Sequence, residues 1–202
     1  MQTEAMKMFG LQAPIFAFSH CQDVVAAVSR AGGMGTLGTT RDSVEDLENM
    51  LGWIDDHVED EPYGVDIMFA SNAPKEFENM SAREIIGLVP EEHWAFVDEI
   101  LQTHDVPPYS KAEKEEVVET YIKEQLRTHA QAEARLEVVY RHPKARMIVS
   151  ALGVPPSHHI ERAHSLGLKV GALVGHPRHV KYHKAAGVDL LIAAGYEAGG
   201  HT

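Results

Sequence analysis

Two adjacent glycines followed directly by a histidine form the segment of this sequence whose residue types are best suited to chemistry. His201 comes after Gly199 and Gly200, near the carboxyl end of the chain. Adjacent glycines let the backbone approach a ligand closely, and an imidazole titrates near neutral pH and can act as a general acid or base. Two interpretations stay open: a loop that presents a base to a ligand, and a surface turn with an exposed histidine.

The residues before these glycines predict the element that would position them. Residues 190–194 (LLIAA) are a short apolar run bounded by glycines, which favours a strand buried on both faces. The glycine-rich segment would then leave the carboxyl end of a parallel strand, where α/β sheets and barrels bind ligands. We therefore expect His201 to lie at that edge of a sheet.

Other histidines have spacings that could do chemistry. His176, His179 and His183 are spaced like metal ligands on a helix, but neither a cysteine nor clustered carboxylates accompany them. We therefore predict no metal site. His158 and His159 follow two prolines at the expected start of a helix and could line the rim of a pocket.

Composition limits the class of protein. The chain has 202 residues, 44% of them hydrophobic, which is enough for one domain with a sizeable core. Its net charge of −12 argues against nucleic acid or an anionic membrane as a partner. The single cysteine, Cys21, excludes an internal disulfide, and the first residues lack the apolar core of a secretory signal. We expect a cytoplasmic protein.

Apolar runs alternate with amphipathic segments along most of the chain, and this order is typical of a parallel sheet. Val44, Leu47, Leu51 and Ile54, for example, mark one face of a helix. Strands are expected over residues 11–18, 34–37, 63–69, 147–151, 169–174 and 190–194.

Residues 71–144 interrupt this alternation after the third strand. Helical patterns cover 81–88, 90–104 and 111–140, with Pro107 and Pro108 as a break. The segment is too long for one crossover helix, so we expect a helical insertion that serves as a lid or a contact surface.

The fold class expected is α/β, as an incomplete TIM (β/α)8-type barrel; an open doubly wound sheet also fits the alternation. A complete barrel needs roughly 200 to 250 residues, so only about six βα units fit beside the insertion. The last strand has no helix after it. We therefore expect residues beyond Thr202.

Four stretches resemble the nitronate monooxygenase family, also called 2-nitropropane dioxygenase-like. They are residues 13–15 (API), 32–35 (GGMG), 187–189 (GVD) and 197–202 (EAGGHT), of which the last is the most specific. Residues 19–28 also resemble one bacterial branch of the family. The resemblance covers residues 11–69 and 147–202 but not the insertion in detail.

The resemblance implies that residues 1–202 form a partial FMN-binding TIM-barrel domain. It implies oxidation of alkyl nitronates, in some members also nitroalkanes, by O2, with His201 as the catalytic base. A homodimer is a further expectation. Residues 13–16 would contact FMN at the carboxyl end of the first strand, and the phosphate would lie on loops after strands seven and eight, which this sequence does not include. The implied cofactor-binding residues are Ala13, Pro14, Ile15, Phe16, Asp66, Ser150, Ala198, Gly199 and Gly200.

Two other functions stay open. A flavin-type enoyl-acyl-carrier-protein reductase has a similar motif near its histidine but consumes NAD(P)H. The chain could instead be a non-catalytic partial barrel that serves as a subunit or binding module.

Overall fold

The computed structural model describes residues 2–40, 42–69, 80–125 and 129–198 of the chain. The chain divides into two compact units, and each is described here by itself. The barrel unit comprises Met1–Ser71 and Arg127–Thr202, and the inserted unit comprises Asn72–Leu126. Among the helices described, none has the length and apolar character needed to cross a bilayer.

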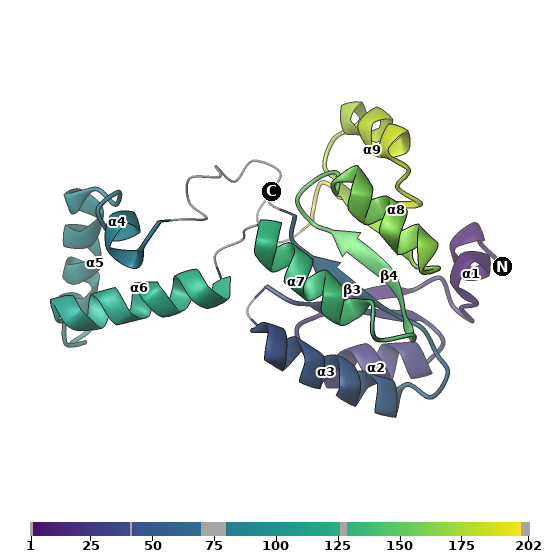
Figure 1. Ribbon diagram of the computed structural model, residues 1–202, viewed down its shortest axis with the longest axis horizontal. Helices are drawn as coiled ribbons and strands as arrows, with labels where there is room; N and C mark the ends of the chain where they lie inside the picture. The colour runs from purple at the N-terminus through teal and green to yellow at the C-terminus, as the bar shows by residue number, and fades with distance from the viewer. Residues whose placement is uncertain (1, 41, 70–79, 126–128, 199–202) are drawn as a thin grey trace. The chain divides into compact units, whose positions relative to one another are not determined.

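The barrel unit is built on a six-stranded parallel sheet in which the strands follow one another in chain order. This sequential order is that of a barrel, whereas a doubly wound sheet reverses its order at a switch point. The strands form a curled half-barrel (Figure 1), which confirms the expected incomplete barrel. The strands are β1 (Phe16–Ser19), β2 (Met34–Gly38), β3 (Tyr63–Ile67), β4 (Ala145–Ser150), β5 (Lys169–Val174) and β6 (Leu190–Ala193).

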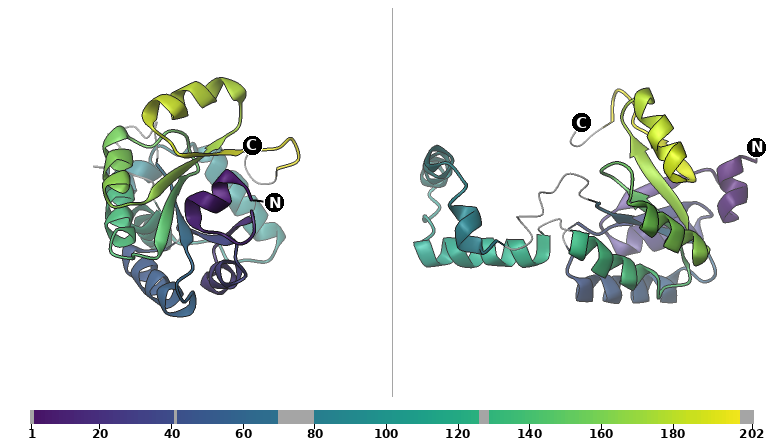
Figure 2. Two further views of the ribbon diagram at one scale, coloured as in Figure 1. Left: turned by 90° about the vertical axis from the view of Figure 1, so that its right-hand side faces the viewer. Right: turned by 45° about the horizontal axis from the view of Figure 1, so that its top comes forward.

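Helices cover the outer face of the curled sheet, and one helix lies at its amino end. Figures 1 and 2 show the amino-terminal helix α1 beyond the amino ends of the strands. Met6 of α1 and Leu11 pack there with Met34 and Met147, so they fill the amino end of the inner face. The helices of this unit are α1 (Glu4–Phe9), α2 (Gln22–Arg30), α3 (Val44–His57), α7 (His129–Val139), α8 (Ser157–Ser165), the short 3-10 turn η2 (Pro177–His179) and α9 (Val180–Ala186).

The insertion ends earlier than the sequence pattern indicated. Residues 111–140 predicted one continuous helix, but α7 belongs to the barrel unit, where Leu136, Val138 and Val139 are buried in the outer core. Helix α7 packs against α3 and β3 and is therefore the crossover helix between β3 and β4. The inserted unit ends at Leu126 rather than at the expected residue 144. Its helices are α4 (Ala82–Ile86), α5 (Glu91–Thr103) and α6 (Lys111–Gln125).

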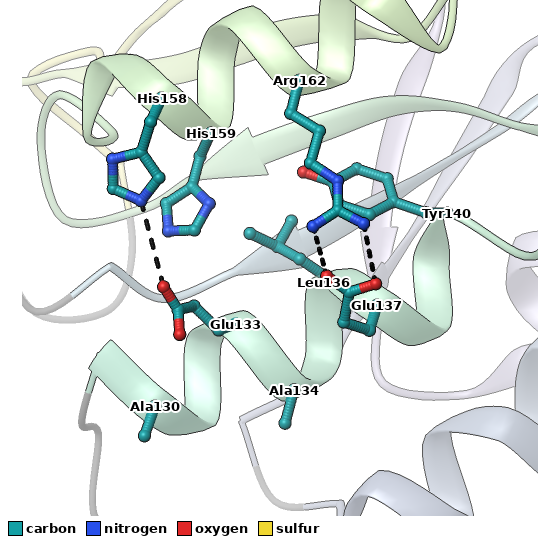
Figure 3. Close-up of a pocket in the computed structure, with 9 residues that line it drawn as sticks. All are labelled: Ala130, Glu133, Ala134, Leu136, Glu137, Tyr140, His158, His159 and Arg162. Carbon is teal, nitrogen blue, oxygen red and sulfur yellow. Dashed lines mark hydrogen bonds and ion pairs between the residues drawn. The ribbon is translucent and has the colours of Figure 1, made fainter.

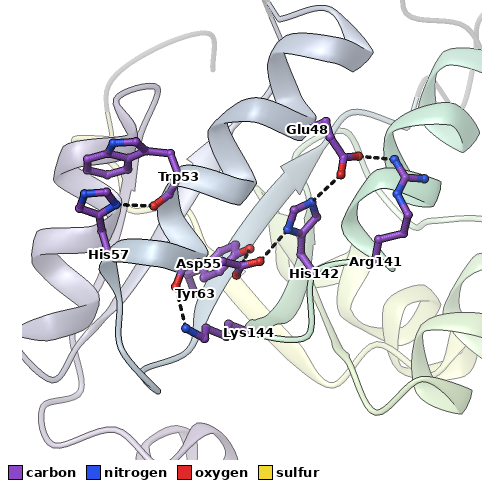
Figure 4. A network of polar contacts seen from close by, with 8 residues as sticks. All are labelled: Glu48, Trp53, Asp55, His57, Tyr63, Arg141, His142 and Lys144. Atoms are coloured by element: carbon purple, nitrogen blue, oxygen red, sulfur yellow. Dashed lines mark hydrogen bonds and ion pairs between the residues drawn. The ribbon is translucent and has the colours of Figure 1, made fainter.

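A polar network at the amino end of the sheet links α3 to β4 (Figure 4). Asp55 accepts hydrogen bonds from the Tyr63 hydroxyl at 3.0 Å and contacts Nδ1 of His142 at 2.7 Å. The ammonium group of Lys144 donates to the backbone carbonyl of Asp55 at 2.6 Å. Since catalytic groups of such barrels lie at the opposite end, this network serves stability.

We expect Gly35→Ala to lower the free energy of unfolding by about 2–3 kcal/mol, because it forces overpacking. A Cβ at Gly35 would lie 2.2 Å from the carbonyl oxygen of Val25 on α2, and backbone cannot move aside as a side-chain tip can. Urea unfolding measures the loss. The matched control is Gly52→Ala in α3, where a Cβ meets nothing within 4 Å; it should stabilise by about 0.5–1 kcal/mol. Equal effects at both positions would contradict the prediction.

Candidate active site

The carboxyl ends of all six strands meet at one edge of the half-barrel, because every neighbouring pair is parallel. This is the edge at which barrels of this architecture bind ligands. The side chains that point inward from the strand ends therefore decide what could be held there.

Asp66 of β3 points to the inner face of the half-barrel. Its register partner on β4 is Val149, which belongs to the inner apolar cluster. Its sequence neighbours Val65 and Ile67 pack in the outer core instead, as the alternation of a strand requires. The structure thus places one carboxyl group near the carboxyl end of the inner face.

The environment of Asp66 favours the neutral form of its carboxyl group. The residue is only 5% exposed, and among the described residues its Oδ1 has no hydrogen-bond partner. Burial raises the pKa of Asp66 to about 7, because desolvation penalises the charged form. A carboxyl group that is partly neutral near pH 7 can donate a hydrogen bond as well as accept one. The Thr39 hydroxyl donates to the backbone carbonyl of Asp66 at 2.7 Å and fixes the main chain here.

Phe18 and His20 lie over the end of β2, where only a glycine leaves room for them. A Cβ on Gly38 would come within 2.5 Å of the Phe18 ring and 2.7 Å of the His20 ring. Nδ1 of His20 lies 3.0 Å from the carbonyl oxygen of Gly38, and the two rings meet edge to face at 5.1 Å. Since Gly38 is the register partner of Asp66, these rings belong to the same end of the inner face.

Some apolar side chains on this inner face are exposed. Phe18 is 57% exposed and Leu173 is 38% exposed. Leu173 pairs in register with Ile192, which packs on the inner cluster. The inner face therefore offers an apolar surface next to one buried carboxyl group, an arrangement suited to a flat, partly polar ligand.

Ser150 ends β4 as expected, but its side chain does not face inward. Its register partner Ile67 packs in the outer core, and its hydroxyl donates to the carbonyl of Gly153 at 2.7 Å. Its hydroxyl therefore braces the loop after β4 and is not directed at a ligand on the inner face.

Residues Ala13, Pro14, Ile15 and Phe16 lie at the end of the sheet opposite to the one we expected. Strand β1 begins only at Phe16, which pairs with Met34, the first residue of β2. The N–H of Ala13 donates to the carbonyl of Gly32 at 2.9 Å, and this bond holds the segment at the amino end of β2. The structure thus does not bring these residues together with Asp66.

The glycine-rich segment after β6 is described only in part. Ala198 is exposed, and its N–H donates to the carbonyl of Gly195 at 3.1 Å, which forms a turn. Gly199, Gly200 and His201 lie outside the described residues. The roles assigned to them stay predictions.

Comparison with known proteins identifies the family. The model of the family described as nitronate monooxygenase matches residues 2–202. The chain belongs to the nitronate monooxygenase family. This family is one of oxidoreductases, and the membership confirms the resemblance carried by the glycine and histidine motifs.

Curated relatives support the same family. The chain is 41% identical over 209 residues to a Mycobacterium tuberculosis protein named as a monooxygenase, and it spans 53% of that protein. It is 26% identical over 211 residues to a Staphylococcus saprophyticus protein named as a nitronate monooxygenase, of which it spans 51%. The chain thus spans about half the length of the curated relatives it matches.

Solved structures support the fold. The nitroalkane oxidase of Streptomyces ansochromogenes superposes with a TM-score of 0.63 at 21% identity, over 99% of this chain and 50% of the other. FabK from Thermotoga maritima superposes with a TM-score of 0.63 at 19% identity, over 100% of this chain and 46% of the other. At these identities the likeness concerns the fold alone.

Reasoning from sequence missed Phe18 and Gly38 as parts of this end of the inner face. A glycine as the last residue of a buried strand was the available signal, since it marks a close approach of another group. The sequence does not show which groups approach Gly38, because Phe18 and His20 come from a different strand and its loop.

Proposed function

We propose that the chain is the flavin-binding part of a nitronate monooxygenase that uses FMN and O2 to oxidise alkyl nitronates, and nitroalkanes after deprotonation. The observation that carries this proposal is the match of the family over residues 2–202. The names of the curated relatives support it. A cytoplasmic location, supported by the single cysteine, and a homodimeric assembly are parts of the same proposal.

The inner face has the chemistry that an isoalloxazine ring needs. Such a ring has an apolar end and a polar edge that carries both an N–H group and carbonyl oxygens. Asp66 has a buried oxygen without a partner among the described residues, which suits the polar edge. Phe18 and Leu173 have exposed apolar surface for the rest of the ring. The residues present therefore fit a flavin.

The flavin, when bound, would supply electron transfer, and protein groups would position the substrate and move protons. His201 would take the α-proton of a neutral nitroalkane, which leaves the nitronate and an imidazolium. A nitronate has already lost this proton, so His201 would then act as a hydrogen-bonding or cationic partner. Asp66, partly neutral near pH 7, would donate or accept a hydrogen bond at the ring.

Anaerobic stopped-flow mixing of the FMN-loaded full-length protein tests this proposal. We expect an alkyl nitronate to bleach the flavin absorbance and NADPH to leave it nearly unchanged. Rapid bleaching by NADPH would instead favour the reductase. A protein that stays colourless after purification with added FMN would favour the non-catalytic module.

A further inference from the structure

A second cluster of chemically capable side chains lies outside the barrel, between helices α7 and α8. Figure 3 shows Glu133 of α7 directed toward His158 of α8, with His159 beside it. These residues border a cavity of about 400 Å³. The cluster is separate from the inner face that carries Asp66, because α7 and α8 pack on the outer core.

The three side chains converge closely enough to share one ion. Glu133, His158 and His159 each offer one ligand atom, and these atoms all lie within 4.8 Å of one another. Nε2 of His158 lies 3.9 Å from Oε1 of Glu133. Ligand atoms about 2.0–2.2 Å from a tetrahedral zinc ion are roughly 3.3–3.6 Å apart. A side-chain movement of less than about 1 Å would therefore bring these two atoms to that spacing.

The cluster combines one fixed ligand with two adjustable ones. His159 is 8% exposed, and its ring packs 5.5 Å from the ring of Phe69, which holds its position. The side chains of His158 and Glu133 are 66% and 59% exposed, so both can change rotamer without disturbing the core. Coordination would cost little rearrangement.

The surrounding charges permit a cation. Arg162, a cationic side chain that lines this cavity, is already paired with Glu137, with Nη2 to Oε2 at 2.8 Å, and it stacks over Tyr140 at 4.6 Å. The amino end of α8 carries partial positive charge, which opposes a cation. The negative charge of the Glu133 carboxylate counteracts this repulsion of a cation.

We propose that Glu133, His158 and His159 form a zinc site that joins α7 to α8. Two imidazoles and one carboxylate are a known zinc ligand set and leave the fourth position to water. Imidazole ligands favour Zn²⁺ over Mg²⁺ and Ca²⁺. The sequence prediction of no metal site did not consider this group, because Glu133 comes from a helix that the sequence pattern assigned to the insertion.

This site would connect two crossover segments of the barrel. Glu133 lies on the helix between β3 and β4, and His158 and His159 lie on the helix between β4 and β5. An ion held by both would restrain the two helices and stabilise the folded state by mass action. Zinc should therefore raise the thermal unfolding temperature as well as bind.

Titration of the untagged, EDTA-treated full chain with ZnCl2 in a calorimeter tests the proposal. We expect one zinc ion per chain, visible absorption bands when Co²⁺ replaces it, and no displacement by excess Mg²⁺. Glu133→Gln and His158→Gln should each weaken zinc binding by about tenfold or more. Both side chains are exposed, so circular dichroism of the variants without metal should match that of the wild type.

The double variant His176→Gln/His179→Gln is the matched control. It removes one exposed and one half-buried histidine outside the cluster and should leave zinc binding and its thermal shift unchanged. Absence of zinc binding by the wild type would overturn the proposal. Equal binding by the wild type and by the Glu133 and His158 variants would also overturn it.

Discussion

Asp66→Asn is expected to raise the free energy of unfolding above pH 7 by up to about 4 kcal/mol. Burial raises the pKa of Asp66 from 3.8 to about 7, and a shift of one pKa unit corresponds to about 1.4 kcal/mol. The folded state therefore binds this proton more tightly than the unfolded state does. The wild type should lose stability from about pH 4 upward, and the full cost is present above about pH 7.

Urea unfolding of both proteins between about pH 4 and about pH 9 measures this effect. Asparagine has nearly the same shape and no charge, so the difference between variant and wild type should be small near pH 4 and grow up to pH 7. The control is Asp60→Asn, since Asp60 is exposed in the loop after α3. A constant difference between Asp66→Asn and wild type over this range would show that the carboxyl group is not desolvated.

The strands of the barrel unit could be predicted from the sequence because each is a short apolar run with a clear boundary. The first run, residues 11–18, is the exception. Its apolar residues do not reveal where pairing starts, and the bond from Ala13 to Gly32 leaves only Phe16–Ser19 as strand. Because the first strand was expected to begin at residue 11, residues 13–16 were expected at the carboxyl end of the sheet, whereas they lie at its amino end.

The expected end of the helical insertion differs from the structure for a different reason. Residues 111–140 are rich in helix-forming residues throughout, so local propensity shows no interruption between α6 and α7. The distinction lies in burial: Leu136 and Val139 pack in the outer core, whereas residues 111–120 of α6 bury none of their side chains. Tertiary contacts, which the sequence does not display, divide the segment.

The sequence could predict that the Asp66 side chain points inward, but it could not predict how deeply this side chain is buried. Alternation along β3 gives Asp66 the face opposite to Val65 and Ile67. The same alternation separates Ser150 from Val149, and this would have excluded the Ser150 hydroxyl from the inner face. The exposure of 5% depends on the neighbouring strands, so the raised pKa could not be foreseen.

His201→Asn is expected to lower kcat for neutral nitroalkanes by about a hundred- to ten-thousand-fold, the range that a general base contributes. Asparagine can hydrogen-bond but cannot take the α-proton. Flavin absorbance should be retained, since the adjacent glycines are unchanged. Turnover of the preformed nitronate should persist in part, because its proton is already gone. Steady-state assays of the full-length, FMN-loaded protein with both substrates measure the contrast.

The ratio of nitroalkane turnover to nitronate turnover distinguishes loss of a base from general damage to the protein. A variant that only disturbed the fold or the flavin would lose both activities together, whereas loss of a base affects only the substrate that must be deprotonated. His176→Asn, at an exposed histidine after β5, is the control and should leave both rates unchanged. If nitroalkane and nitronate turnover fell equally, His201 would be a binding residue, and another group would have to take the proton. His20, held over the end of β2 by its contact with Gly38, would then be the first residue to test.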